Sequence, residues 1–238
     1  MELKCGFAVS AYHRNHDRLS VFKTCITSIM TTKKENTVVI IVDDGSPVTE
    51  HLDWVTSQYP TIKCVRKSEN GGIAKCKNTC LRELHEAGCD VFFLFDDDFS
   101  LLQTIEDKYV AALQEENVYV LSGVSHGNTV LCGFTSNTVR THLLNGFLLC
   151  VTAETFMRAG YFKIFPEKYG HEHTWYTYRI MHVTGQPGFL DISDGENYYK
   201  MLDATGSLEL GYVIHSIAQN GSVSSTEWSI DLFRDCVE

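Results

Sequence analysis

The chain has 238 residues, of which 44% are hydrophobic and 21% are charged. This length and composition fit one folded domain with a sizeable core and exclude a disordered chain. The formal net charge of -10 disfavours general nucleic-acid binding, because an acidic surface repels phosphate backbones.

The nine cysteines are not spaced as metal-binding pairs, and even Cys76 and Cys80 are separated by three residues. An odd number of scattered cysteines is typical of free thiols in a reducing compartment. No apolar segment follows the first residues, and apolar runs such as Val91 to Phe95 are too short to cross a bilayer. We therefore expect a cytoplasmic protein without a transmembrane segment.

The first hundred residues predict strands that alternate with helices. Apolar or β-branched runs indicate buried strands, and apolar residues at helical spacing indicate helices. Such an alternation predicts a parallel α/β sheet, in which ligands bind beyond the carboxyl ends of the strands. The expected strands cover residues 5–10, 37–42, 62–65 and 91–95, and the expected helices begin near residue 19 and cover 51–59 and 73–87.

The second half of the chain is less regular. Its patterns predict a helix, a strand, two strands of a mixed or antiparallel section and a short helix, and the pattern is weak after Gly185. No linker, repeat or low-complexity segment divides the sequence, so we expect one domain over residues 1–238. These elements cover residues 103–115, 118–122, 130–135, 143–151 and 154–159.

Three adjacent carboxylates, Asp96 to Asp98, follow the buried strand that ends at Phe95. They repel one another unless a cation is present, and Mg²⁺ or Mn²⁺ prefers oxygen ligands. Asp96 and Asp98 would point to one side of an extended chain. The alternative is a solvated acidic loop that caps a helix beginning near Leu101.

Two further segments lie at positions suited to a nucleotide. Asp43 and Asp44 follow a strand, where a carboxylate can accept a hydrogen bond from a base N–H; a common turn is the alternative. Asn70 and Gly72 precede a helix that carries Lys77, and glycine lets the backbone approach a diphosphate closely. The alternative there is a loop followed by a lysine-bearing helix.

Glu172 and His173 precede an aromatic run and do not form an HExxH zinc motif. Either side chain could act as a general base beside a sugar, and a polar turn before an amphipathic helix is the alternative. His215 follows a short apolar run, which fits either a metal ligand or a histidine at the end of a strand.

Together, and in this order, the segments resemble the family-2-type inverting glycosyltransferases and their GT-A relatives. Val42–Ser46 matches the V-D-D-G-S motif fully, and Phe95–Asp98 resembles the strand-end D-x-D. Asn70–Asn78 is similar to N-x-G-x-x-x-A-R-N, with lysine in place of the arginine. Ala8–Arg14 resembles the opening strand and its P-T-Y-N-R end, and Gly160–His173 resembles the later G-x-F and G-x-E-D segment.

The resemblance implies a GT-A fold with a Rossmann-like, mostly parallel sheet between helices. Residues 1–100 would then form the nucleotide-binding half and residues 101–238 the acceptor-binding half. It implies a metal-dependent, inverting glycosyltransferase that uses Mn²⁺ or Mg²⁺. The donor would be a nucleoside-diphosphate-sugar, with UDP-sugar expected from family frequency, and the acceptor a glycan, a lipid-linked sugar or a small molecule.

The resemblance also implies roles for single residues. Tyr12, Asp43 and Asp44 would lie at the nucleotide base with Arg14 nearby, and Asp98 would be the stronger metal ligand. The donor-binding set would comprise Ser10, Ala11, Tyr12, Arg14, Asp43, Asp44, Asn70, Gly72, Lys77, Asn78, Asp96 and Asp97, and the metal set Asp98, Asp96 and His215.

One departure from the family pattern bears on catalysis. The catalytic aspartate of the E-D pair is replaced by His173. The base is then His173 or Glu172, or the reaction retains configuration and needs no such base.

Two other functions compete with this interpretation. A sugar-phosphate nucleotidyltransferase would need a glycine-rich, arginine-containing loop after the first strand, which residues 10–14 do not supply. A catalytically silent nucleotide-sugar-binding or scaffold module is favoured only by His173, and it predicts donor binding without turnover.

Overall fold

The computed structural model describes residues 2–115, 117–123, 132–133, 135–141, 146–165 and 172–202. A six-stranded sheet forms its centre, in the order β3-β2-β1-β4-β9-β6. The first four are parallel, whereas β9 runs antiparallel to both β4 and β6. The predicted mostly parallel α/β sheet is therefore confirmed. The strands are β1 (Cys5–Ala11), β2 (Val38–Asp43), β3 (Lys63–Arg66), β4 (Val91–Phe95), β6 (Val120–Ser122) and β9 (Leu148–Thr152).

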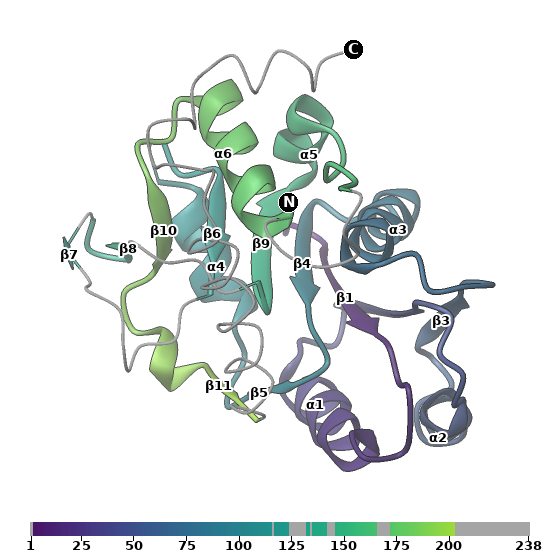
Figure 1. Ribbon diagram of the computed structural model, residues 1–238. Helices are drawn as coiled ribbons and strands as arrows, with labels where there is room; N and C mark the ends of the chain where they lie inside the picture. Colours follow the sequence, from purple (N-terminus) through teal and green to yellow (C-terminus); the bar gives the residue numbers. More distant parts are fainter. Residues whose placement is uncertain are drawn as a thin grey trace, which may run out of the picture. The chain divides into compact units, whose positions relative to one another are not determined.

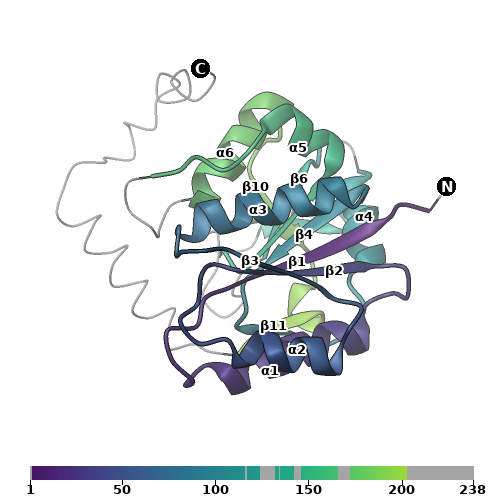
Figure 2. The same cartoon turned by 90° about the vertical axis from the view of Figure 1, so that its right-hand side faces the viewer.

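Helices cover both faces of this sheet (Figures 1 and 2), because its central strands are apolar on both sides. In β4, Phe93 and Phe95 pack in one core with residues of α1, α2 and α4. Phe92 and Leu94 pack in the other core with residues of α3, α5 and α6. The helices are α1 (Leu19–Thr32), α2 (Glu50–Gln58), α3 (Ile73–Glu86), α4 (Glu106–Leu113), α5 (Ala153–Ala159) and α6 (Glu172–Thr184). None of the described helices has the length and hydropathy of a membrane span.

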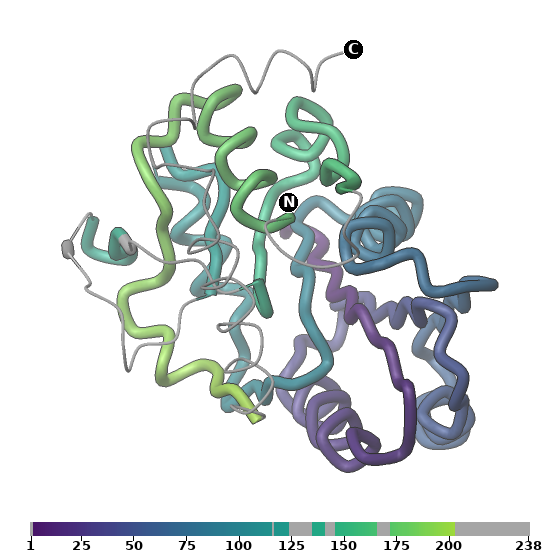
Figure 3. The backbone as a smooth tube through the Cα atoms, in the orientation of Figure 1, coloured from purple at the N-terminus to yellow at the C-terminus, as the bar shows by residue number. Residues whose placement is uncertain are grey.

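Two small sheets join distant parts of the sequence, as the chain path in Figure 3 shows. β5 (Phe99–Leu101) pairs antiparallel with β11 (Tyr199–Met201), which follows the short helix η1 (Gly195–Asn197). β8 (Thr138–Thr141) pairs with β7 (Cys132–Gly133) and with β10 (Phe189–Ile192).

The helix expected over residues 103–115 is confirmed as α4, whereas the alternative of a helix beginning near Leu101 is wrong, because residues 99–101 form a strand. The partner of that strand lies about a hundred residues further along the chain, so local periodicity could not reveal it. The backbone N–H of Leu202 then donates to the carbonyl of Asp98 at 2.8 Å. This pairing holds the acidic segment that follows β4 in place.

The carboxyl ends of β1, β2 and β4 lie at one edge of the sheet, because these strands are parallel neighbours. The segments that follow them begin at Tyr12, Asp44 and Asp96. The turn after β2 contains Gly45, whose φ of +72° favours glycine. A Cβ at this position would lie 2.4 Å from the backbone carbon of Glu69, so this turn packs directly against the loop that precedes α3.

Candidate active site

Asp43, the last residue of β2, is fully buried and organises the turn that follows it. Its Oδ1 accepts hydrogen bonds from His51 Nε2 at 3.1 Å and from Ser46 Oγ, and Arg66 Nε lies 3.4 Å from Oδ2. Burial raises the pKa of Asp43, but the hydrogen bonds from His51 and Ser46 outweigh burial and hold it below its usual value. The carboxylate is therefore ionised and fixed in direction.

Asp44 ties this turn to the glycine loop before α3. Its carboxylate accepts hydrogen bonds from the backbone N–H groups of Gly71 at 3.2 Å and Gly72 at 2.8 Å, and it forms an ion pair with Lys67. Asn70 Oδ1 accepts a second bond from the Gly72 N–H at 3.0 Å. The structure thus brings the predicted residues Asp44, Asn70 and Gly72 together.

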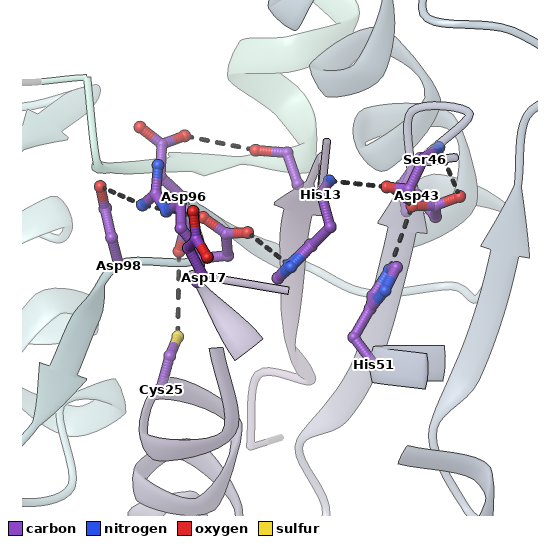
Figure 4. Close-up of polar contacts among 12 residues, drawn as sticks. His13, Asp17, Cys25, Asp43, Ser46, His51, Asp96 and Asp98 are labelled. Carbon is purple, nitrogen blue, oxygen red and sulfur yellow. Dashed lines mark hydrogen bonds and ion pairs between the residues drawn. The ribbon is translucent and has the colours of Figure 1, made fainter. Parts of the chain in front are cut away.

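The three carboxylates after β4 have polar partners from the loop after β1 and the residues around it (Figure 4). Asp96 accepts from Ser10 Oγ at 3.2 Å and is the least buried of the three, with 32% of its side chain exposed. Asp97 Oδ2 lies 3.1 Å from His13 Nε2. Asp98 Oδ2 accepts from Arg18 Nη2 at 2.9 Å, and the same nitrogen lies 3.5 Å from Asp97 Oδ1. Arg18 therefore serves two of the three carboxylates.

Asp98 retains capacity for a cation. Burial, followed by repulsion from Asp96 and Asp97, raises its pKa to about 6, and Arg18 opposes this only in part. Its buried Oδ1 accepts no hydrogen bond from the described residues. Within the described ranges, no three His, Cys, Asp or Glu side chains form a ready metal-ligand set. His215, the third predicted ligand, lies outside those ranges.

Lys77 is the buried cation of the site, with no exposed surface. Its Nζ lies 2.7 Å from Asp96 Oδ1, donates to the carbonyl of Gly146 at 2.7 Å and contacts Nε2 of His173. An ammonium group only donates, so this Nε2 must accept and the imidazole is neutral. Burial and the charge of Lys77 both lower the pKa of His173 well below its usual value.

Gly146 leaves room for this arrangement. A Cβ at position 146 would lie 2.5 Å from Cδ2 and 2.8 Å from Nε2 of His173, so a larger residue would displace the imidazole ring. Glu172, the first residue of α6, has its Oε1 3.7 Å from the same Nε2. The two base candidates therefore adjoin one another, and only His173 contacts Lys77.

The other predicted residues lie around these clusters. Asn78 exchanges two hydrogen bonds with the backbone of Phe162, at 3.0 and 2.7 Å, and so clasps α3 to the loop after α5. Ala11 is buried and its carbonyl accepts from the N–H of Asp44 at 2.9 Å. Tyr12 is half-buried and Arg14 is exposed.

Sequence reasoning missed His13, Arg18, His51 and Gly146. Each matters through a partner at least eight positions away, which no motif spacing reveals. For His51, the available signal was its position four residues before Val55, on the buried face of α2.

Known proteins resemble this chain in sequence. Residues 8–175 match the family model described as glycosyl transferase family 2. The chain is 29% identical over 214 residues to an uncharacterized glycosyltransferase of Acanthamoeba polyphaga mimivirus, and the match covers 84% of this chain and 81% of the viral protein.

Solved glycosyltransferase structures share the fold. GalNAc-T7 with UDP, GalNAc and Mn²⁺ matches with a TM-score of 0.63 and 14% identity, over 80% of this chain and 43% of that one. Mannosyltransferase PcManGT from Pyrobaculum calidifontis, in complex with GDP-Man and Mn²⁺, matches with 0.58 and 17%, over 77% and 54%. TarS 1-349 from S. aureus in complex with UDP matches with 0.59 and 17%, over 83% and 60%. The chain spans about half the length of these structures, and the likeness confirms a GT-A fold.

Proposed function

The chain belongs to glycosyl transferase family 2, and on that premise we propose that it moves one sugar from a nucleoside-diphosphate-sugar to a hydroxyl group of a glycan or small-molecule acceptor. The observation that supports this proposal is the contact of the buried Lys77 ammonium with Asp96, next to Asp98, whose carboxylate is repelled by its acidic neighbours. A fixed cation and closely spaced carboxylates at the carboxyl edge of the sheet suit a diphosphate and its counter-ion. UDP is the first nucleotide to test, since two of the similar structures contain it.

Asp98 and Asp96 are the residues that would hold a divalent cation, Mn²⁺ or Mg²⁺. Their fit rests on the buried, unbonded Oδ1 of Asp98 and on the mutual repulsion within the triplet. When bound, the cation supplies positive charge against the diphosphate. Lys77 adds a second positive charge, whose direction is fixed by the carbonyl of Gly146 and by His173.

At the nucleotide end, we assign Asp43 and Asp44 chiefly to shaping the pocket. Their oxygens are already engaged by Ser46, His51, Lys67 and the glycine loop. Half-buried Tyr12 and exposed Arg14 remain the side chains proposed to meet the base. The N–H groups at the start of α3 are the proposed neighbours of the ribose and diphosphate.

Glu172 is the general base in this proposal, and His173 is not. The Nε2 lone pair of His173 is occupied by Lys77, and burial beside that cation disfavours a protonated imidazole. The Glu172 carboxylate accepts the proton of the acceptor hydroxyl as that oxygen bonds to the anomeric carbon. The bond from this carbon to the diphosphate oxygen breaks with its electron pair, and configuration inverts.

A catalytically silent nucleotide-sugar-binding module is the second candidate, favoured by His173 at the position of the family's catalytic aspartate. It shares the donor site and differs only in turnover.

Thermal-shift titration tests the site. The wild-type chain and Asp98→Asn are titrated with UDP, GDP, UDP-sugars and GDP-sugars, with and without Mn²⁺. Ligand that binds only the native state stabilises it by about 2.7 kcal/mol at a hundredfold excess over Kd. A shift for one nucleotide that needs Mn²⁺ and is lost in Asp98→Asn supports the proposal. A folded wild-type protein that responds to none of these compounds contradicts it.

A further inference from the structure

Two histidines stack beneath the acidic clusters. The rings of His13, two residues after β1, and His51, in α2, lie 4.2 Å apart between centroids with an angle of 15° between their planes. Phe22 packs edge-on against both, at 5.1 and 5.2 Å. Both imidazoles are buried, with 2% and 0% of their surface exposed. Burying a polar ring without a polar partner costs free energy of folding, so we expect each imidazole to have a polar partner.

Each ring contacts a carboxylate of a different cluster (Figure 4). His51 Nε2 lies 3.1 Å from Asp43 Oδ1, at the end of β2. His13 Nε2 lies 3.1 Å from Asp97 Oδ2, after β4, as an electrostatic contact without full hydrogen-bond alignment. Because the ionised carboxylate of Asp43 only accepts, Nε2 of His51 carries a proton.

A second connection runs in parallel with the stack. The backbone N–H of His13 donates to Ser46 Oγ at 2.8 Å, and Ser46 Oγ donates to Asp43. β1 lies between β2 and β4 in the sheet, so the loop after β1 links the segments on either side of it. The stacked rings and this hydrogen bond thus add a side-chain connection between the two acidic clusters across β1.

From this geometry we infer that the stacked His13–His51 pair is a positioning unit that holds the Asp43 turn and the Asp96–Asp98 triplet at the separation a nucleoside diphosphate requires. The inference rests on the proposed function. The Asp43 turn serves the base end and the triplet serves the diphosphate end, and the covalent length between these ends is fixed. His13 draws Asp97 aside, so Asp96 and Asp98 are the carboxylates left for the diphosphate and its counter-ion. Neither histidine is assigned a contact with the donor.

The test compares a nucleoside monophosphate with its diphosphate. Kd values for UMP and UDP, or for GMP and GDP if the wild-type chain prefers guanine, are measured calorimetrically with Mn²⁺. His13→Phe keeps a ring for the stack but removes the contact with Asp97, whereas His13→Gln keeps a donor at the position of Nε2. His85→Gln, on the exposed end of α3, is the matched control.

We expect His13→Phe to raise the Kd of the diphosphate by about tenfold or more, equivalent to about 1.4 kcal/mol of binding free energy. We expect the Kd of the monophosphate to rise by less than about threefold. We expect His13→Gln to recover most of this loss and His85→Gln to match the wild type. A melting temperature and circular dichroism spectrum show that each variant is folded at the assay temperature.

An unchanged ratio of diphosphate to monophosphate affinity in folded His13→Phe overturns the inference, even if the variant is less stable. Equal losses for both nucleotides give this result, because the histidine would then support the fold without setting the separation. If the wild-type chain binds neither nucleotide, the proposed function itself fails, and that result is distinct from an unchanged ratio.

Discussion

The ammonium group of Lys77 lies 2.7 Å from the carboxylate of Asp96, although the lysine side chain is fully buried and the aspartate is partly exposed. A buried ammonium is stable only when its protons are used, and Asp96, Gly146 and His173 use them here. The contact places a fixed positive charge against the most open carboxylate of the triplet. The fold sets this contact, because Lys77 lies in α3 and Asp96 directly follows β4.

Replacing Lys77 with methionine keeps most of the length of the side chain and removes its charge. We expect kcat to fall by about a hundredfold or more, because the proposed mechanism loses a preorganised positive charge for the leaving diphosphate. Steady-state kinetics with a nucleotide-sugar measures this loss. Lys63→Met, at a side chain that is 58% exposed on β3, is the matched control and should leave kcat unchanged. An unchanged kcat in Lys77→Met would show that the charge of the lysine has no role in the reaction.

Gly146→Ala tests the packing that holds His173. The new Cβ would lie within 3 Å of the imidazole ring, so we expect a lower melting temperature and a lower kcat. In a His173→Asn background the ring is absent, and the same alanine should cost less. A double-mutant cycle of melting temperatures measures this coupling. Additive effects of the two substitutions would show that the glycine is required for another reason.

The ionisation of Glu83, which lies in α3 away from the candidate site, predicts how the stability of the fold depends on pH. Hydrogen bonds from Lys63 and Arg82 hold the pKa of Glu83 below its usual value. The folded state therefore gains stability above the unfolded pKa of about 4.3, and this gain is lost as the pH falls through the lower folded pKa.

We expect Glu83→Gln to melt below the wild type at pH 7 and to approach it as the solution is acidified to about pH 3. Glu86→Gln removes a more exposed carboxylate 3.9 Å from Arg82 and should have little effect at either pH. A stability difference for Glu83→Gln that does not shrink on acidification would contradict the assignment. Melting curves across this pH range provide the measurement.

Much of the fold of the first hundred residues could be predicted from the sequence, because the strands of the central sheet there have a local signal. Residues 39–42 and 91–95 are apolar runs buried on both faces of a parallel sheet, and that burial imposes the composition. β5 and β11 had no such signal, because their residues are defined by pairing with each other across the chain.

The candidate site was predicted in part for the same reason. The motifs identified the carboxylates, the glycine loop and Lys77, since these cluster at strand ends and helix starts. Their partners lie elsewhere in the sequence. His173 reaches Lys77 from 96 positions away, and Gly146 accepts its proton from 69 positions away. Such contacts depend on the folded path of the chain, and local periodicity does not record them.

Glu172 is the decisive side chain of the proposed mechanism, because it is the proposed general base. Glu172→Gln keeps the size of the residue and removes the base. We expect this variant to bind the nucleotide as the wild type does, with the same Mn²⁺-dependent thermal shift. We expect its rate of sugar transfer to fall by about a hundredfold to ten-thousandfold.

The central claim is tested most directly by measuring release of nucleoside diphosphate from UDP-sugars and GDP-mannose with Mn²⁺, in the wild-type chain and in Glu172→Gln. Water serves as a slow acceptor, so no acceptor needs to be known. The account predicts measurable donor cleavage by the wild type and a loss of about a hundredfold or more in Glu172→Gln. A wild-type chain that binds the donor with a metal-dependent thermal shift and cleaves none of it would contradict the account and identify a silent binding module.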